Sequence, residues 1–313
     1  MAVVVFGSAN VDISIDVGSL PKLGETKQGS DYRIGLGGKG LNQAVAASRL
    51  SNSLVQFIGA VGTDHFGSFL ESELAALGVA TSGIRRDPTR PTGMALIHVD
   101  RDGNNSITVS GGANLSWTTS HVSDLAFDGT IVGLCQLETP FDVTVEILKR
   151  LSNADALTIL DPAPIPEEAI DEIFPVVDIL TPNQHEAERL LNRTILNSEQ
   201  AVQGAIALVK RGGFKAVIIT MGEQGVAYSE NGTDGDWLPA FQVDTIDTVA
   251  AGDCFNGALA ASIVNGVSFR ESVVFAMAAA ALSVTKEGAS SSVPSLIAVQ
   301  EFLANHKQPG STS

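Results

Sequence analysis

A run of small residues leads into one acidic residue in the segment DTVAAGDCFNGAL, residues 247–259. Ala250, Ala251 and Gly252 come directly before Asp253, and the apolar residues after it are typical of a helix. The N-terminus of a helix presents free N–H groups and the positive end of the helix dipole, which suit a phosphate or a developing negative charge. An aspartate there can accept a proton from a hydroxyl group. The segment therefore predicts a phosphoryl-transfer site with Asp253 as the base, with an ordinary helix-capping acid as the alternative.

A glycine-rich segment, GLGGKGLN at residues 35–42, is the second candidate. It satisfies the G-x-G-x-x-G spacing of dinucleotide-binding proteins, but residues 55–62 lack the acidic residue that should follow about 20 positions on. It is not a P-loop either, because position 33 is Arg and no Ser or Thr follows Lys39. Glycines let the backbone approach a ligand closely, so Lys39 and Asn42 can hydrogen-bond a polyol. The alternative is a helix N-terminal turn with an exposed lysine.

Three more polar segments follow predicted buried strands, whose carboxyl ends form the ligand-binding edge of open α/β sheets. Asn10 and Asp12 come after the first strand and can bond sugar hydroxyls. Asn183 and Glu186 follow a later strand, and the carboxylate can hold Mg²⁺ through water. Residues 220–225, TMGEQG, end a strand in a glycine turn of the kind that lines a nucleotide. For these segments the alternatives are a polar loop, a first-turn acid and a hairpin turn.

These segments need a scaffold, and short apolar runs alternate with amphipathic stretches along the chain. The runs are too apolar for half-exposed strands, which predicts an α/β fold with a mainly parallel central sheet and helices on both faces. The predicted strands are residues 3–7, 55–60, 94–100, 130–134, 156–160, 179–181, 216–220 and 225–229. The predicted helices are residues 39–50, 66–77, 143–151, 199–210, 252–264, 269–286 and 294–306. We expect one domain over residues 1–313.

Two stretches break this rhythm, at residues 13–37 and 95–110. In the second, apolar alternation flanks the turn Arg101-Asp102-Gly103, which is a strong hairpin signal. Both stretches predict strands outside the parallel sheet. Together they would form a small antiparallel β-sheet, which can act as a lid over a cleft.

Composition excludes several classes of protein. The net charge of −16, from 19 Lys and Arg against 35 Asp and Glu, argues against nucleic-acid and anionic-membrane partners. No apolar run reaches the ~18–20 residues of a membrane span, and the N-terminus lacks the basic region of a signal peptide. The two cysteines, Cys135 and Cys254, are too few for a disulfide framework. We therefore expect a cytoplasmic protein with small-molecule partners.

The segments GGKGLNQAVAASRLSNSLVQFIGAVG, residues 37–62, and DTVAAGDCFNGAL, residues 247–259, resemble the two signature segments of the ribokinase-type carbohydrate kinases. Asn183-x-x-Glu186 and Thr220-x-Gly222 lie between them in the order typical of the family, and the likeness runs along essentially the whole chain. The segments GGKGxNQA and Asp161-Pro-Ala-Pro164 are most similar to the members that act on ribose. The resemblance implies a kinase that uses ATP and Mg²⁺ to phosphorylate the O5 hydroxyl of D-ribose, with K⁺ as activator.

The resemblance also implies a role for each matching residue. Asp253 would be the base, and the N–H groups of Ala250, Ala251 and Gly252 would stabilise charge on the transferring phosphoryl group. The implied sugar ligands, besides Asp253, are Asn10, Asp12, Gly38, Lys39, Asn42 and Glu138. The implied nucleotide ligands are Asn183, Thr220, Gly222, Gly225 and Gly252, with Glu186 binding Mg²⁺ through water. The implied K⁺ ligands are Asp247, Val249, Ser283, Lys286, Gly288 and Ser292.

Three positions depart from the family pattern: Met277 replaces a common His, Cys254 a common Thr, and Asp161 a common Asn. We expect none of them to touch the chemistry. Members of the family often dimerise through the lid sheet, which implies a homodimer. Two alternatives stay open at this point. One is a kinase for 2-deoxyribose, another pentose or a nucleoside, and the other is a catalytically silent protein that binds a sugar or nucleotide.

Overall fold

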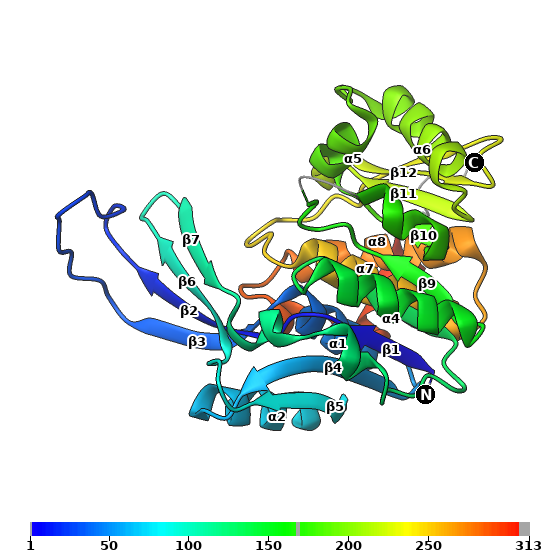
Figure 1. The fold of residues 1–313 in the computed structure, drawn as a ribbon. Helices are drawn as coiled ribbons and strands as arrows, with labels where there is room; N and C mark the ends of the chain where they lie inside the picture. Colours follow the sequence, from blue (N-terminus) through cyan, green and yellow to red (C-terminus); the bar gives the residue numbers. More distant parts are fainter. Residues whose placement is uncertain (1, 167–169, 307–313) are drawn as a thin grey trace.

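The computed structural model describes residues 2–166 and 170–306. Within these ranges a nine-stranded sheet forms the centre of the molecule, in the order β13-β12-β11-β10-β9-β8-β1-β4-β5 (Figure 1). Its strands are β1 (Val3–Phe6), β4 (Val55–Gly62), β5 (Ala80–Asp87), β8 (Val132–Cys135), β9 (Leu157–Leu160), β10 (Ile179–Leu180), β11 (Ala216–Thr220), β12 (Gly225–Glu230) and β13 (Asp236–Pro239). Strands β12 and β13 are antiparallel to their neighbours, and the other pairings are parallel. The predicted mainly parallel sheet is therefore confirmed.

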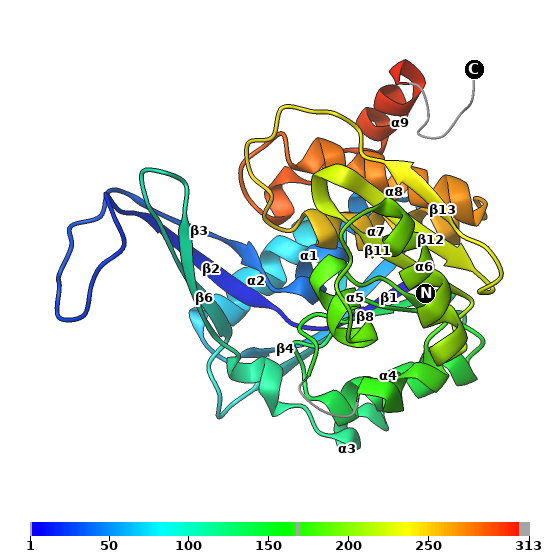
Figure 2. The ribbon, with the colours of Figure 1, turned by 90° about the horizontal axis from the view of Figure 1, so that it is seen from above.

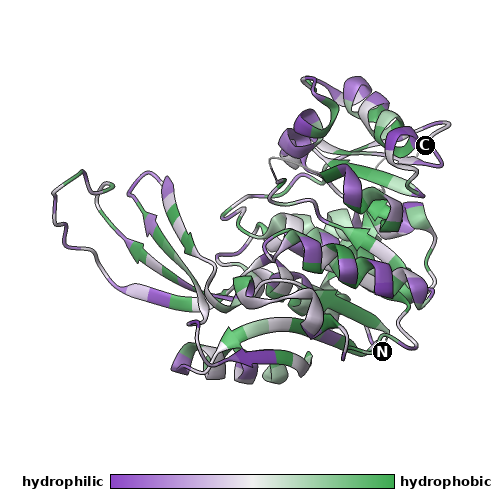
Figure 3. Ribbon diagram, in the orientation of Figure 1, coloured by the Kyte–Doolittle hydropathy of each residue, from purple (hydrophilic) through white to green (hydrophobic). Residues whose placement is uncertain are grey.

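Helices cover both faces of this sheet because each strand sends alternate side chains to opposite faces. In β1, Val3 and Val5 join one buried apolar cluster, whereas Val4 and Phe6 join a second one on the other face. The first cluster includes side chains from α1 (Lys39–Leu50), α2 (His65–Ala76), α7 (Ala251–Val264), α8 (Phe269–Ser283) and α9 (Leu296–Asn305). The second includes side chains from α3 (Thr119–Val122), α4 (Phe141–Asn153), α5 (Gln184–Leu191) and α6 (Ser198–Gly212). The hydropathy colouring shows the apolar strands enclosed by helices with polar outer faces (Figure 3).

A second, four-stranded sheet projects from the body (Figures 1 and 2). Its order is β3-β2-β6-β7, with β2 (Asn10–Asp16), β3 (Tyr32–Gly37), β6 (Gly93–Val99) and β7 (Asn105–Ser110). The two stretches expected to leave the central sheet do so, and the hairpin predicted at Asp102-Gly103 joins β6 to β7. The two outer pairs are antiparallel, but the central pair, β2 with β6, is parallel. Both strands run outward from the body, so they must point the same way. We call these four strands the lid sheet.

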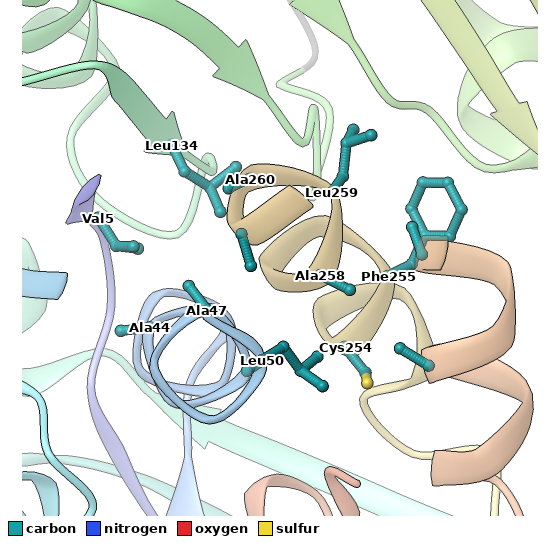
Figure 4. Packing of buried hydrophobic residues seen from close by; sticks show 14 of the residues in the cluster. Val5, Ala44, Ala47, Leu50, Leu134, Cys254, Phe255, Ala258, Leu259 and Ala260 are labelled. Carbon is teal, nitrogen blue, oxygen red and sulfur yellow. The ribbon is translucent and has the colours of Figure 1, made fainter. Parts of the chain in front are cut away.

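Helices α1 and α7 lie against each other near the middle of the molecule (Figure 4). The contact is close because Gly257 of α7 faces the backbone of α1. A β-carbon at Gly257 would lie 2.5 Å from the Gln43 carbonyl oxygen and 2.8 Å from the Ala47 nitrogen. The labelled side chains Ala44, Ala47 and Ala258 are correspondingly small. This packing joins the two helices that carry the conspicuous segments of the sequence.

Several elements differ from the sequence-based expectation. Helix α1 spans Lys39–Leu50 as predicted, but β5, β13, α3 and α5 were not anticipated. Strand β5, ATSGIRRD, lies at the sheet edge, where charged side chains reach solvent and mask the apolar pattern of a strand. Among the helices that the structure describes, none has the length and hydrophobicity that a bilayer crossing requires.

Candidate active site

The candidate site lies at the carboxyl ends of the central strands. Strand β1 lies between β4 and β8. The chain first adds β4 and β5 on one side of β1, and later adds β8 to β13 on the other side. Open α/β sheets bind ligands at such a switch point. Polar residues follow several of these strands directly: Ser8 and Asn10 after β1, Gln136 and Glu138 after β8, and Asp161 after β9. Asn10, which was predicted to bind a ligand because it follows the first strand, therefore lies at this switch point.

Asp253 lies in the first turn of α7 and is buried, with 6% of its surface exposed. Its Oδ2 accepts a hydrogen bond from Asn42 Nδ2 at 3.1 Å, and its Oδ1 accepts one from Gln43 Nε2 at 3.0 Å. Both donors come from α1, which the Gly257 contact brings against α7. The carboxylate orientation is thus set by two amide donors and is more restricted than that of a solvated capping acid.

The residues just before Asp253 form a tight entry to α7. Ala250 has φ 58° and ψ 16°, in the left-handed region that is unfavourable for an alanine. Gly252 faces open space, because a β-carbon there would meet no atom within 4 Å. The Ala251 N–H lies 3.3 Å from the Thr248 carbonyl oxygen, which is a long hydrogen bond. The small-residue run therefore leaves backbone uncovered at the N-terminus of α7, as a phosphate-binding turn requires.

Lys39 lies next to Asp253, and Glu138 binds the backbone of Lys39. The Lys39 Nζ is 3.9 Å from Asp253 Oδ1 and 3.7 Å from Asp161 Oδ2. The Glu138 carboxylate caps α1, accepting a hydrogen bond from the Lys39 backbone N–H at 3.0 Å and a second one from the Ser8 hydroxyl. Gly38 precedes the helix with φ 86°, a conformation that favours glycine. The charges of the surrounding carboxylates, Asp161 first, raise the pKa of Lys39, so its ammonium stays positive.

Asp12 brings a further carboxylate to the same side. It lies on β2, paired with Gly35 of β3 and Ala95 of β6. Burial, followed by the charges of Glu138 and Asp253, raises the pKa of Asp12 to about 7. A carboxyl group with this pKa can donate or accept a hydrogen bond near neutral pH, which suits a hydroxyl-rich ligand.

Asn42 presents an unused acceptor beside these groups. Its Nδ2 is bonded to Asp253, and its Oδ1 is buried without a hydrogen-bond partner among the residues that the structure describes. A buried polar atom without a partner costs free energy, of the order of 1–3 kcal/mol. A ligand hydroxyl that donates to Asn42 Oδ1 would remove that cost.

Asn10 is held by a residue that the sequence did not indicate, Asn114. The Ala9 N–H donates to Asn114 Oδ1 at 2.9 Å, and Asn114 Nδ2 donates to the Ala9 carbonyl oxygen at 3.1 Å. These backbone partners fix the orientation of the Asn114 amide. Its Nδ2 also donates to Asn10 Oδ1 at 2.8 Å. The oxygen of Asn10 is therefore occupied, which leaves the Asn10 NH₂ group as the donor for a ligand.

A cleft of about 520 Å³ opens next to Asp253, which is one of its lining residues. Four of the five predicted nucleotide residues, Asn183, Thr220, Gly222 and Gly252, line it. Gly225 has a different position, since it packs against β13 with its Cβ site 2.1 Å from the Leu238 carbonyl oxygen. The residues that line the cleft are Lys39, Asn183, Gln184, His185, Thr220, Met221, Gly222, Glu223, Thr248, Ala250, Ala251, Gly252 and Asp253.

Asn183 and Glu186 form a capping box at the start of α5. Asn183 Oδ1 accepts from the Glu186 N–H at 3.0 Å, and Glu186 Oε2 accepts from the Asn183 N–H at 2.7 Å. Burial raises the pKa of Glu186. The pair thus has a structural role, which leaves Glu186 Oε1 as the oxygen that can accept a hydrogen bond from water.

The six residues predicted to hold K⁺ come from two loops that lie side by side. Asp247 connects them, because its Oδ1 accepts from the Val249 N–H at 3.0 Å and its Oδ2 from the Gly288 N–H at 2.9 Å. The Ile246 N–H also donates to the Val284 carbonyl oxygen at 2.8 Å. Ser283, the last residue of α8, and Ser292 of the second loop are buried. The first of these loops leads directly into the 250–252 turn.

Gln43 and Asp161 join the site although neither was predicted to act there. Gln43 Nε2 donates to both Asp253 Oδ1 and Asp161 Oδ2. Asp161, which was expected not to touch the chemistry, thus shares a donor with the predicted base. A signal for Gln43 was present, since Lys39 and Gln43 are four residues apart and share a helix face. Asp161 follows the predicted strand 156–160 directly, but its partners come from distant segments, so its contacts were not predictable.

Known proteins resemble this chain over its whole length. It matches the model of the pfkB family carbohydrate kinases over residues 2–296. A ribokinase of Haemophilus influenzae is 39% identical over 302 residues, which cover 96% of this chain and 97% of the relative. A deoxyribokinase of Salmonella typhi is 32% identical over 306 residues, covering 97% and 99%. A solved structure, Arabidopsis thaliana ribokinase complexed with ribose and ATP, has a TM-score of 0.87 at 32% identity and covers 97% of this chain and 99% of that one.

The chain belongs to the pfkB family of carbohydrate kinases. It is accordingly an enzyme that transfers a phosphoryl group from ATP to a sugar. The predicted family and fold are confirmed.

Proposed function

We propose that this chain transfers the γ-phosphoryl group of ATP to the O5 hydroxyl of D-ribose and releases ribose 5-phosphate. The observation that supports this most is the buried Asp253 carboxylate, which α1 donors hold at the N-terminus of α7 beside the uncovered Gly252. The ribokinases among the relatives support ribose as the sugar.

In this reaction Asp253 accepts the proton of the O5 hydroxyl as that oxygen attacks the γ-phosphorus, and the bond to the ADP oxygen breaks. The backbone N–H groups of Ala250, Ala251 and Gly252 face the charge that develops on the transferring group. The sugar is held by Asn10, Asp12, Gly38, Lys39, Asn42 and Glu138. The proton then leaves Asp253 for solvent when the product departs.

Mg²⁺ accompanies ATP in such a kinase and neutralises charge on the β- and γ-phosphates. The residues present fit this ion, because Mg²⁺ keeps several waters and needs only one or two carboxylates. Glu186, through Oε1, would accept hydrogen bonds from those waters. Asn183, Thr220, Gly222 and Gly225 would contribute to the nucleotide side, with Gly225 acting through the shape of the turn.

A monovalent cation fits the two loops around Asp247. The donor set is one carboxylate with main-chain carbonyl and serine oxygens, and such oxygens replace the hydration shell of K⁺ in proteins. The ligands would be Asp247, Val249, Ser283, Lys286, Gly288 and Ser292. A cation there would hold the loop that positions the 250–252 turn.

Asp247→Ala should remove the stimulation of turnover by K⁺. The substitution takes away the carboxylate and its bonds to Val249 and Gly288, so added K⁺ can no longer stabilise the loop. Turnover would be measured against KCl at constant ionic strength, with circular dichroism to check the fold. The exposed Asp244→Ala, three residues upstream, is the matched control. An unchanged K⁺ response in folded Asp247→Ala would count against this site.

Asn114→Leu should raise KM for ribose by roughly 3–10-fold while kcat changes less, because a single oriented hydrogen bond contributes about 0.5–1.5 kcal/mol. Leucine has a similar volume but cannot hold the Asn10 amide. Steady-state kinetics with varied ribose measures the effect, and the exposed Asn105→Leu on β7 is the control. Equal loss in kcat and kcat/KM would contradict a role in ground-state sugar binding.

The lid sheet supports a homodimer. Tyr32, Ile34 and Leu96 are 66%, 45% and 43% exposed. The strand register places Ile34 and Leu96 beside Ile13, with Tyr32 on the same face, so they form one apolar surface. A second lid sheet would cover it.

Cys135 and Cys254 are both buried free thiols, which supports a reducing compartment such as the cytoplasm.

ADP release from Mg·ATP with K⁺ tests the proposed function, using ribose, 2-deoxyribose, fructose and adenosine. Ribose should give the highest kcat/KM. Preference for 2-deoxyribose would make the enzyme functionally more similar to its deoxyribokinase relative. No turnover with any of these sugars, from folded protein that binds ATP, would refute ribose phosphorylation and indicate another substrate or a silent binding protein.

A further inference from the structure

Asp161, directly after β9, is a buried carboxylate that shares its partners with the catalytic base. Its side chain is 7% exposed. The Gln43 Nε2 amide donates one hydrogen bond to Asp161 Oδ2 at 2.8 Å and another to Asp253 Oδ1 at 3.0 Å. The Lys39 Nζ lies between the same two oxygens, 3.7 Å from Asp161 and 3.9 Å from Asp253. One amide and one ammonium therefore serve two carboxylates.

The amide of Gln43 cannot easily turn away from this arrangement. Gln136 Nε2 donates to Gln43 Oε1 from the end of β8, which directs the Gln43 NH₂ group at the two carboxylates. An amide NH₂ group has two hydrogens, and each is used here. The separation of the carboxylates is thus set by the fold, and Lys39 is the most exposed member of the group, with 31% of its side chain accessible.

We propose that Asp161 is a positioning residue that draws the Lys39 charge away from Asp253 and so makes Asp253 a stronger base toward the sugar hydroxyl. The inference rests on the proposed function, because it assigns Asp253 the role of base. The physical reason is electrostatic: the negative charge of Asp161 opposes a second negative charge nearby, and competition for one ammonium leaves Asp253 less neutralised. Without the Asp161 charge, the Lys39 ammonium would neutralise Asp253 alone.

Other charged groups also act on Asp161, Lys39 and Asp253. Asp253 of α7, Lys39 of α1 and Glu186 of α5 act on Asp161. Glu138, after β8, and Asp12, on the lid sheet, add negative charge next to Lys39 and Asp253. Burial raises the pKa of Asp161 to about 7, while the Lys39 charge opposes that rise. The charge on Asp161 therefore changes near neutral pH, where the enzyme would work.

The isosteric variant Asp161→Asn tests the proposal, because Gln43 can still donate to its oxygen. In kcat/KM against pH, the wild type should gain activity in a step near pH 7, where Asp161 becomes charged, and the variant should lack that step. Above that step the kcat of the variant should be roughly 3–10-fold lower, and below it the two enzymes should be alike. A purely structural role would lower activity by the same factor at every pH. The control is Asp178→Asn, whose carboxylate binds the Thr158 N–H and Lys215 outside the cleft and should keep the step.

A second measurement does not depend on turnover. In protein labelled with ¹³C at the aspartate carboxyl carbons, the Asp253 signal is the one missing from Asp253→Asn. In the wild type that signal should move in a step near pH 7, where Asp161 becomes charged, and this step should be missing in Asp161→Asn. No such step in the wild type, or the same step in the variant, would overturn the inference. Failure of the sugar assay alone, with the steps as expected, would overturn only the proposed reaction.

Discussion

Asp253→Asn should lower kcat/KM for sugar phosphorylation by roughly 10²–10⁴-fold, the range that general-base catalysis contributes. Asparagine keeps the shape of the side chain but cannot accept the hydroxyl proton. It also offers one carbonyl oxygen to the two donors from Asn42 and Gln43, so one of them loses its acceptor. ADP release with saturating sugar measures the loss, and calorimetric titration with ATP shows whether the nucleotide still binds.

Asp142→Asn provides the matched comparison for the base. Asp142 is exposed and lies outside the cleft, in the first turn of α4. It therefore lies in the first turn of a helix, as Asp253 does, but lacks the buried hydrogen-bond partners of Asp253. It should cost a few tenths of a kcal/mol in stability, as a first-turn acid does, and leave turnover unchanged. If the two variants behaved alike, Asp253 would be only a capping acid.

Gly257→Val should have the largest effect on stability. The added side chain would begin 2.5 Å from both the Ala46 β-carbon and the Gln43 carbonyl oxygen, and the latter is backbone that cannot rotate away. Helices α1 and α7 would have to separate, at a cost at or above the upper end of the 1–3 kcal/mol typical of overpacking. The separation would also move Asn42 and Gln43 away from Asp253, so kcat should fall at temperatures where the variant is still folded.

Gly204→Val on α6 is the corresponding control. The atoms nearest to its added β-carbon would be the ends of the Ile219, Leu191 and Ile195 side chains, at 3.2–3.5 Å. These can adjust, so the variant should unfold closer to the wild type and keep its kcat. Thermal unfolding followed by circular dichroism compares the two. Equal loss of stability in both would show that the cost comes from valine within a helix and that the α1–α7 contact is unimportant.

Local signals in the sequence were strong enough to predict much of the fold. Helix α1 and the lid hairpin were anticipated because their start, turn and periodicity are all local features. Helix α5 was missed although its capping box, Asn183-x-x-Glu186, was visible in the sequence. Strand β13 was missed because it is short, lies at the sheet edge and ends in Pro239.

The site was less predictable because its contacts join distant parts of the chain. The hydrogen bonds of Gln43 to Asp161 and Asp253 span 118 and 210 residues. No periodicity or motif contains such information. The resemblance to known kinases indicated Asp253 and Lys39, and it marked Asp161 only as a departure from a common Asn, without a role. The support of Asn10 by Asn114 likewise depends on how the lid strands leave the body.

Strand β2 has one end in the body and the other in the lid sheet. Asn10, at its first residue, is anchored by Asn114, while Asp12, two residues on, is paired with both β3 and β6. If the lid sheet swings about this strand, Asp12 would move relative to Asn10, and a sugar bound to both, as proposed, would gain affinity only in the closed conformation. Nucleotide alone would provide no such bridge. Bound ATP would then meet a complete site only when sugar arrives, which would suppress futile hydrolysis of ATP by water.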